Sequence, residues 1–128
     1  MSRKLVETGR EFESKIAHSA GVVAEGRFLF TSGITSRDDV GDIVGVGNMA
    51  AQIKQVFANL AEVLAQVGAD FLHVIKFTIY VTDIDAYRDT LSGDRTFMDG
   101  APASTLIEVS RLASPDLLVE VEAIVALD

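Results

Sequence analysis

Apolar residues recur most regularly between residues 49 and 67. They fall at spacings of three and four, which is the period of one face of an α-helix. Asn48 has a side chain suited to an N-cap, and Gly68 is suited to ending the helix. The sequence therefore predicts a helix over 49–67 whose apolar face must be covered by a sheet or by another helix. That face consists of Met49, Ile53, Val56, Phe57, Leu60, Val63, Leu64 and Val67.

Apolar and polar residues alternate in three other segments, as they do in β-strands. Residues 71–82, 104–111 and 117–127 all show this alternation and are rich in branched or aromatic side chains. Each segment is therefore expected to be a strand with two unlike faces. The first would place His73, Ile75, Phe77, Ile79 and Val81 on one face, and Val74, Lys76, Thr78 and Tyr80 on the other.

Turn-forming residues indicate how the strands connect. Two short apolar runs, 20–24 and 28–30, flank Gly26-Arg27, which favours a hairpin between them. The segment 113–116 (ASPD) separates the last two predicted strands and favours a second hairpin.

A second helix is expected over residues 83–98, with Asp83 or Asp85 near its N-cap. Ser92-Gly93 lies inside this segment and weakens the helical pattern. The order of elements is then β-β-α-β-α-β-β. This order predicts an α+β fold with both helices on one face of the sheet.

The sheet face away from the helices is expected to mix charged and apolar residues. Three carboxylates and one lysine there need either water or partners across a subunit interface. The apolar neighbours favour an interface. The charged positions are Lys76, Glu108, Glu120 and Glu122, and the apolar neighbours are Val74, Tyr80, Leu106 and Ile124.

The composition is that of a globular protein. The chain has 128 residues, of which 48% are hydrophobic and 23% charged, so residues 1–128 are expected to form a single domain. It contains no Cys, which excludes disulfides, thiol catalysis and cysteine-ligated metals. Its net charge of -8 repels phosphate backbones, so a nucleic-acid partner is not expected.

Other motifs are sparse. The N-terminal segment is polar, and no run approaches the ~18 apolar residues of a membrane helix, so a cytoplasmic protein without a membrane partner is expected. No motif for a nucleotide, a phosphate or a metal ion is present, so no cofactor or metal is expected. His73 is expected to be a hydrogen-bonded histidine in the core or at its rim, and the acidic segment 37–42 a solvated turn.

Four segments resemble, in the same order, the motifs of one protein family. Residues 101–112 (APASTLIEVSRL) resemble the signature PARSxVEVxRL of the Rid family, the YjgF-like reactive-intermediate deaminases. Residues 119–124 (VEVEAI) look like the closing strand IEIEAIA of that family. Residues 30–33 (FTSG) match its TSG element, and residues 74–83 (VIKFTIYVTD) match IVKTTVFVKD. The helix over 52–64 fits the first helix of the family, so the resemblance spans nearly the whole chain.

The resemblance implies a chorismate-mutase-like α+β fold that assembles as a homotrimer. In such trimers the sheets form a central barrel, the helices lie outside, and three clefts between neighbouring subunits hold a small-molecule ligand. The mixed sheet face that the alternation predicts is the face that this assembly would bury.

The resemblance also implies a set of site residues. In the imine and enamine deaminases of this family, the arginine of the PAR motif binds the substrate carboxylate and a glutamate holds the attacking water. Glu120 matches that glutamate and is the candidate catalytic residue. Ser104 stands at the position of the arginine, while Ser19 and Leu91 replace a tyrosine and an asparagine. The implied substrate-binding residues are Ser19, Ser32, Gly33, Leu91, Ser104 and Leu106.

Three other arginines could in principle replace the one missing at position 104. Arg111 lies seven residues further along the same strand and on the opposite face, which excludes it within one subunit. Arg88 and Arg95 lie on the predicted second helix, nearer the cleft, and Arg95 is the candidate substitute.

The expected function is hydrolysis or deamination of a small imine, enamine or carbamate-like metabolite. Ser104 argues against the usual 2-imino-acid deaminase activity, because one neutral hydroxyl cannot replace a guanidinium. One alternative is a non-catalytic trimer that binds a small metabolite. A second is the endoribonuclease activity of some relatives, against which the net charge of -8 argues.

Overall fold

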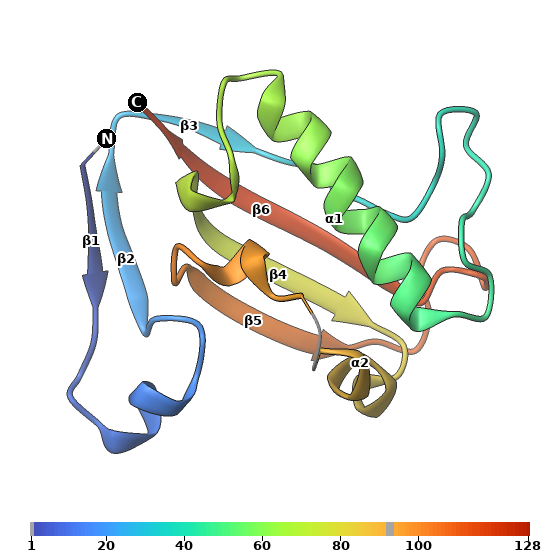
Figure 1. The fold of residues 1–128 in the computed structure, drawn as a ribbon, viewed down its shortest axis with the longest axis horizontal. Coiled ribbons are helices and arrows are strands. Elements are labelled where there is room, and N and C mark those ends of the chain that lie inside the picture. Colours follow the sequence, from blue (N-terminus) through green and yellow to red (C-terminus); the bar gives the residue numbers. More distant parts are fainter. Residues whose placement is uncertain (1, 92–93) are drawn as a thin grey trace.

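The computed structural model describes residues 2–91 and 94–128. A four-stranded sheet, in the order β3-β6-β4-β5, is covered on one face by the helices (Figure 1). Strands β1 and β2 pair with each other in a separate two-stranded sheet beside it. The elements are β1 (Ser2–Val6), β2 (Gly21–Glu25), β3 (Arg27–Phe30), α1 (Met49–Ala65), β4 (Val74–Val81), α2 (Ile84–Thr90), β5 (Ala103–Glu108) and β6 (Val119–Leu127), with 3-10 turns at Glu11–Lys15, Phe71–His73 and Thr96–Met98.

Helix α1 confirms the predicted first helix. The Asn48 side chain accepts a hydrogen bond from the backbone N–H of Ala51 at 3.0 Å, as an N-cap does. Gly68 has a φ of 68°, in the left-handed region that ends many helices, and the N–H of Ala69 returns to the carbonyl of Leu64 at 3.0 Å. The face turned to the sheet buries Met49, Gln52, Val56, Phe57, Leu60 and Leu64.

The core contains a cluster of aromatic rings between α1 and the sheet. The ring of Phe57 stacks on that of Phe97 with centroids 3.9 Å apart. The same ring meets Phe71 and Phe77 edge-on, at 6.2 and 6.0 Å. Such aromatic pairs stabilise a core beyond the area they bury. The cluster fixes the 3-10 turn that contains Phe97 against the helix and the sheet.

A buried glutamine connects α1 to two loops. The Gln52 side-chain N–H groups donate to the carbonyls of Gly45 and Asp116, at 3.1 and 2.8 Å. Its carbonyl oxygen accepts from the N–H of Leu118 at 2.8 Å. Because Gln52 has no exposed surface, these bonds satisfy polar groups that would otherwise be buried without partners.

Both predicted hairpins are wrong. Strand β2 pairs with β1 and strand β3 pairs with β6, so Gly26, with a φ of 116°, is the point where the chain passes from one sheet to the other. Strands β5 and β6 are not neighbours either. Strand β4 lies between them, parallel to β5 and antiparallel to β6. Turn-forming residues mark where a strand ends, but they do not specify which strand it pairs with.

The second helix is shorter than predicted. Helix α2 ends at Thr90, and the predicted segment also contains the separate 3-10 turn at Thr96–Met98. The side chain of Asp83 accepts from the N–H of Ala86 at 3.0 Å, which confirms it as the N-cap. Ser92-Gly93, which weakened the helical pattern, lies outside the described residues.

The faces of β4 and β5 also differ from the expectation. A bulge between Val74 and Lys76 shifts the alternation, so Val74 is buried with Phe77 on the helix side. In β5, Leu106 packs against the core, and Glu108 accepts from the N–H of Ile84 at the start of α2. Val74, Leu106 and Glu108 therefore lie on the helix-covered face and not on the opposite one. Residues of β5 alternate between the two faces as predicted. The parallel pairing of β5 with β4, however, places each set of alternate residues on the face opposite to the one expected.

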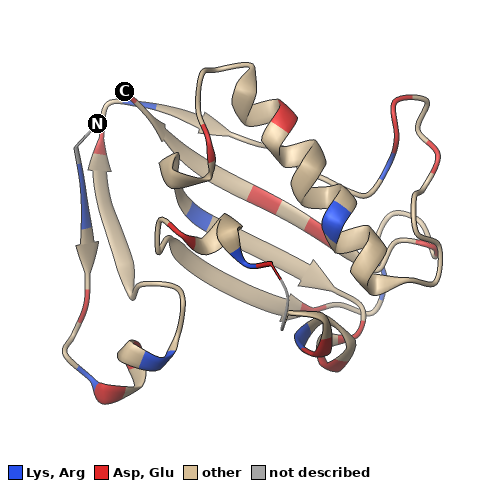
Figure 2. Cartoon of the chain, viewed as in Figure 1, with Lys and Arg blue, Asp and Glu red and all other residues tan. Residues whose placement is uncertain are grey.

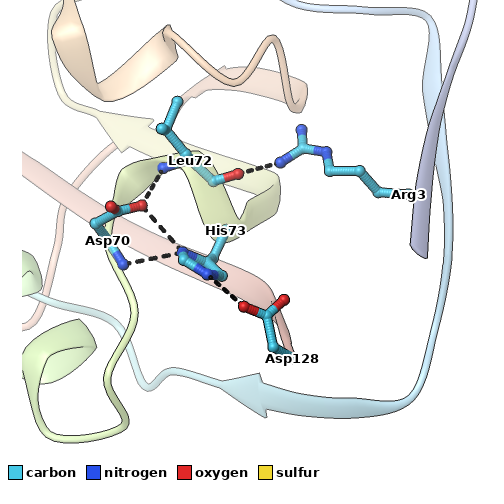
Figure 3. Close-up of polar contacts among 5 residues, drawn as sticks. All are labelled: Arg3, Asp70, Leu72, His73 and Asp128. Atoms are coloured by element: carbon cyan, nitrogen blue, oxygen red, sulfur yellow. Dashed lines mark hydrogen bonds and ion pairs between the residues drawn. The ribbon is translucent and has the colours of Figure 1, made fainter. Parts of the chain in front are cut away.

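His73 is half-buried and hydrogen-bonded, as expected for a histidine at the rim of the core, and Figure 3 shows its contacts. Its Nδ1 lies 3.0 Å from an Asp70 carboxylate oxygen, and its Nε2 lies 3.4 Å from the Asp128 side chain. Arg3 donates to the carbonyl of the neighbouring Leu72. These contacts join β1, the turn before β4 and the end of β6, and they give His73 a structural role.

Candidate functional site

The sheet face opposite the helices carries charged side chains in adjacent positions. Tyr80 of β4 lies beside Glu120 of β6, and Thr78 lies beside Glu122. Lys76 is next along β4 (Figure 2 shows the two acidic bands of β6 and the basic band of β4). We call this the open face. It also carries Phe28 and Phe30 from β3, Thr105 and Ile107 from β5, and Ile124 from β6.

Two hydrogen bonds between side chains link neighbouring strands on the open face. The Tyr80 hydroxyl donates to a Glu122 carboxylate oxygen at 2.7 Å, and this bond raises the pKa of the tyrosine above its ordinary value. Lys76 Nζ donates to the hydroxyl of Thr105 at 2.6 Å. Within the described chain, no ion pair links Lys76 to Glu120 or Glu122. The lysine therefore keeps its charge available to a group outside the chain.

Glu120 is held against Gly33. A Cβ atom at position 33 would lie 1.8 Å from a Glu120 carboxylate oxygen, so any side chain there would displace the carboxylate. The backbone fixes this approach, because Ile34 exchanges two hydrogen bonds with Val121, at 2.7 and 3.0 Å. Ser32 is exposed in the same segment. Three of the expected site residues, Ser32, Gly33 and Glu120, are thus close together at one end of β6.

A second group of expected residues lines a cavity of about 440 Å³ between α2 and β5. Leu91, Ser104 and Leu106 all contribute to its wall. Tyr87 is 2% exposed at its inner side, and burial raises the pKa of its phenol to about 12. The remaining lining residues are His18, Ile79, Arg88, Arg95, Phe97 and Met98.

Ser19 has a different position from the other expected residues. It is 1% exposed, and its hydroxyl donates to the carbonyl of Ala101. Its backbone N–H donates to the carbonyl of Pro102 at 3.2 Å. Ser19 thus anchors the segment that precedes β2 to the loop that precedes β5. It positions a wall of the cavity and is not among the residues that line it.

The two groups lie on opposite faces of the sheet. Glu120 belongs to the open face, beside Tyr80, whereas Ser104 and Leu106 lie beside the core residues Phe77 and Ile79. A ligand in the cavity of one chain therefore does not reach Glu120 of the same chain.

Comparisons with known proteins identify the family. A model of the family described as Endoribonuclease L-PSP matches residues 8–127. A RutC family protein of Synechocystis is 32% identical over 130 aligned positions, which cover 99% of this chain and 98% of the relative. The chain belongs to the Rid family.

Solved structures of Rid proteins share this α+β fold. A Rid family protein from Yersinia pestis aligns with a TM-score of 0.87 and 31% identity, covering 99% of this chain and all of the other. A protein of Thermotoga maritima described as a putative endoribonuclease aligns with a TM-score of 0.69 and 26% identity, covering 100% of this chain and 99% of that one. Among relatives with a named activity, the 2-iminobutanoate/2-iminopropanoate deaminase of the rat is 29% identical over 95% of this chain and 88% of its own length.

The sequence did not indicate that five residues line the cavity of this Rid protein, namely His18, Ile79, Tyr87, Phe97 and Met98. His18 lines it together with the two arginines of the α2 region. The sequence signal for His18 was weak, since it consisted only of its position next to Ser19. Arg88 and Arg95 were recognised as near the cleft, and the structure places both in the cavity wall.

Residues 2–91 and 94–128 hold no cluster of three or more His, Asp or Glu side chains arranged for a metal ion. Over the same residues, neither helix is long and apolar enough to cross a bilayer.

Proposed function

We propose that this Rid protein hydrolyses a C–N bond of a small imine, enamine or carbamate-like metabolite, in clefts between the subunits of a homotrimer. The observation that carries the proposal is the position of Glu120, whose carboxylate is held on the open face by contact with Gly33. Relatives from the rat and from cattle that bear the name 2-iminobutanoate/2-iminopropanoate deaminase support the reaction class.

The separation of the two groups of site residues calls for a second copy of the chain, and the family resemblance implies that the assembly is a trimer. Within one chain, Glu120 and the cavity behind β5 lie on opposite faces of the sheet. A second copy seated on the open face could bring the Glu120 of one chain to the cavity of another. The open face also exposes apolar side chains that such a copy would cover, with Phe30 at 70% exposure and Ile107 at 36%.

The chemistry needs few groups. The Glu120 carboxylate would orient a water molecule and accept one of its protons while the water oxygen attacks the carbon of the C=N bond. The resulting tetrahedral intermediate would collapse when its C–N bond breaks. The nitrogen leaves with the protons as ammonia or an amine, and the carbon becomes a carbonyl. No electron acceptor or donor is required.

Ser104 limits which substrates fit. Its hydroxyl offers one neutral hydrogen bond at the position that the family resemblance gives to a carboxylate-binding arginine. A hydrogen bond to a charged group contributes about 1.5–3 kcal/mol, roughly twice the contribution of a neutral one. Ser104 by itself therefore favours a substrate whose nearby group is neutral, such as an amide or a carbonyl.

The test is the substitution Glu120→Gln. Release of ammonia from imines and enamines generated in solution, both neutral ones and ones that bear a carboxylate, should fall by about 10²- to 10⁴-fold, because the proton acceptor is lost. Glu62→Gln, at an exposed position of α1, is the matched control and should leave the rate unchanged. Light scattering should show the same mass for both variants. Equal rates in the wild type and in Glu120→Gln would refute the mechanism.

A non-catalytic role is the second candidate. Ser19, Leu91 and Ser104 all depart from the residues that the family resemblance implies, and their loss together would leave a cavity that binds without reacting. Thermal-shift screening of small metabolites separates the two proposals, because ligands that raise Tm and are recovered unchanged support binding alone.

RNA cleavage is the function least supported by the charge. Some structural neighbours are described as putative endoribonucleases. The present chain carries 19 acidic residues against 11 basic ones, which disfavours contact with a phosphate backbone.

A further inference from the structure

The cavity between α2 and β5 is basic in an acidic protein. The chain has 19 Asp and Glu residues against 11 Lys and Arg. Yet the described residues that line this cavity include Arg88, Arg95 and His18, and none of them is an Asp or a Glu. A cavity lined in this way attracts anions, although the protein as a whole repels them.

The two arginines reach the cavity from separate segments. Arg88 lies in the last turn of α2, and Arg95 immediately precedes the turn at Thr96–Met98 (Figure 2 shows basic positions in both segments). Among the described residues, neither guanidinium takes part in an ion pair or a side-chain hydrogen bond. Both guanidinium groups therefore remain available to a ligand.

The charge of Arg95 acts inside the cavity. Burial raises the pKa of Tyr87 to about 12, and the positive charge of Arg95 opposes that rise. Tyr87 and Arg95 both line the cavity. Five other lining residues are apolar, namely Ile79, Leu91, Phe97, Met98 and Leu106. The lining of the cavity thus combines two guanidinium groups, several apolar side chains and the Ser104 hydroxyl.

We propose that Arg88 and Arg95 bind the carboxylate of a small ligand whose apolar body contacts Leu91 and Leu106. They would supply the cationic contact that Ser104 cannot make. Guanidinium groups pair with carboxylates through strong charge-assisted hydrogen bonds, and the apolar wall strengthens them by reducing the screening from water. The inference rests on the proposed function only in that it takes this cavity as one wall of the proposed cleft.

The experiment compares two probes of nearly the same shape, benzoate and benzamide, by isothermal titration calorimetry of the full-length protein. The wild type should bind benzoate more tightly than benzamide. Arg95→Gln and Arg88→Gln should each weaken benzoate binding on the order of tenfold, and both together about a hundredfold, with benzamide unchanged. Arg111→Gln removes the same charge from an exposed position outside the cavity and should leave both affinities unchanged.

Three results would overturn the inference. The first is that both cavity variants keep the benzoate affinity of the wild type. The second is that Arg111→Gln loses as much benzoate affinity as the cavity variants do. The third is that the wild type shows no preference for benzoate, either because it binds benzamide equally well or because it does not bind benzoate at millimolar concentration. The same titration in Glu120→Gln separates this inference from the proposed function. If benzoate binding depends on the arginines but the protein has no C–N hydrolase activity, the proposed reaction is refuted and the proposed anion site is retained.

Discussion

The two faces of the main sheet differ in how far their side chains are exposed to water. Along β4 and β6 the helix-covered face is apolar and almost fully buried within one chain, through residues such as Phe77 and Val121. The open face mixes the charged pair Glu120 and Glu122 with an exposed phenylalanine, Phe30. Both faces are built by alternate residues of the same strands. One face is covered by the fold of a single chain, whereas the other leaves charged and apolar side chains exposed together.

The largest expected effect comes from removing one phenylalanine ring on each side of the sheet, that of Phe57 in α1, which packs on the covered face, and that of Phe30 on the open face. Phe57→Ala should lower the free energy of unfolding by about 3–5 kcal/mol, because it removes a ring packed against three others and leaves a cavity. Phe30→Ala should change the free energy of unfolding of a single chain by no more than about 0.5 kcal/mol, since Phe30 is mostly exposed. Urea denaturation measures both.

Protein concentration distinguishes the two variants further. In the proposed trimer Phe30 is covered, so any loss of stability in Phe30→Ala should disappear on dilution. The loss in Phe57→Ala should not depend on concentration, because its contacts lie within the chain. If the two substitutions had equal effects in dilute solution, the contrast between the faces would be wrong.

Local periodicity predicted the elements of this fold better than it predicted their pairing. The cap at Asn48 and the end at Gly68 could be read from the sequence because both depend on neighbouring residues only. Strand β1 was missed, since its short sequence alternates weakly. The pairing of β5 with β4 depends on contacts between segments far apart in sequence, and the turn-forming residues at 113–116 carried no information about it.

The candidate site likewise divides into residues that the sequence identified and a spatial arrangement that it did not. The family resemblance pointed to Glu120, Gly33 and Ser104, and the structure places Glu120 against Gly33. Nothing in the sequence indicated that Glu120 and Ser104 lie on opposite faces, because that follows from the parallel register of β5 beside β4. The bulge after Val74 was equally hidden, since it shifts the alternation without a glycine or proline to mark it.

The second expected effect concerns assembly. Phe30→Asp should weaken self-association by at least tenfold, because it places a carboxylate beside Glu122 in the interface of the proposed trimer. Light scattering over a dilution series measures the change. Val40→Asp, at an exposed loop position, adds the same charge and should leave association unchanged. A Phe30→Asp protein that stays as large as the wild type at every concentration would show that the open face is not the contact surface.

The smallest expected effect contrasts the two tyrosines of the chain, one on each side of the sheet. The pKa of Tyr87 is raised to about 12 mainly by burial. The pKa of Tyr80 is raised first by its hydrogen bond to Glu122, then by burial and by the charges of Glu122 and Glu120. Glu122→Ala should therefore return the pKa of Tyr80 towards its ordinary value and leave that of Tyr87 unchanged.

The direction of the pH dependence follows from these raised pKa values. The folded state favours the neutral phenol of Tyr80, so the stabilisation from its bond to Glu122 is complete below the unfolded pKa of about 10 and is lost as pH rises through the folded pKa. Phenolate absorbance during an alkaline titration follows both groups, and Tyr80→Phe assigns them. Glu120→Ala should lower the pKa of Tyr80 less than Glu122→Ala does, because Glu120 acts through its charge alone. An equal shift in the two variants would mean that general negative charge on the open face, and not the bond across the strands, sets the titration of Tyr80.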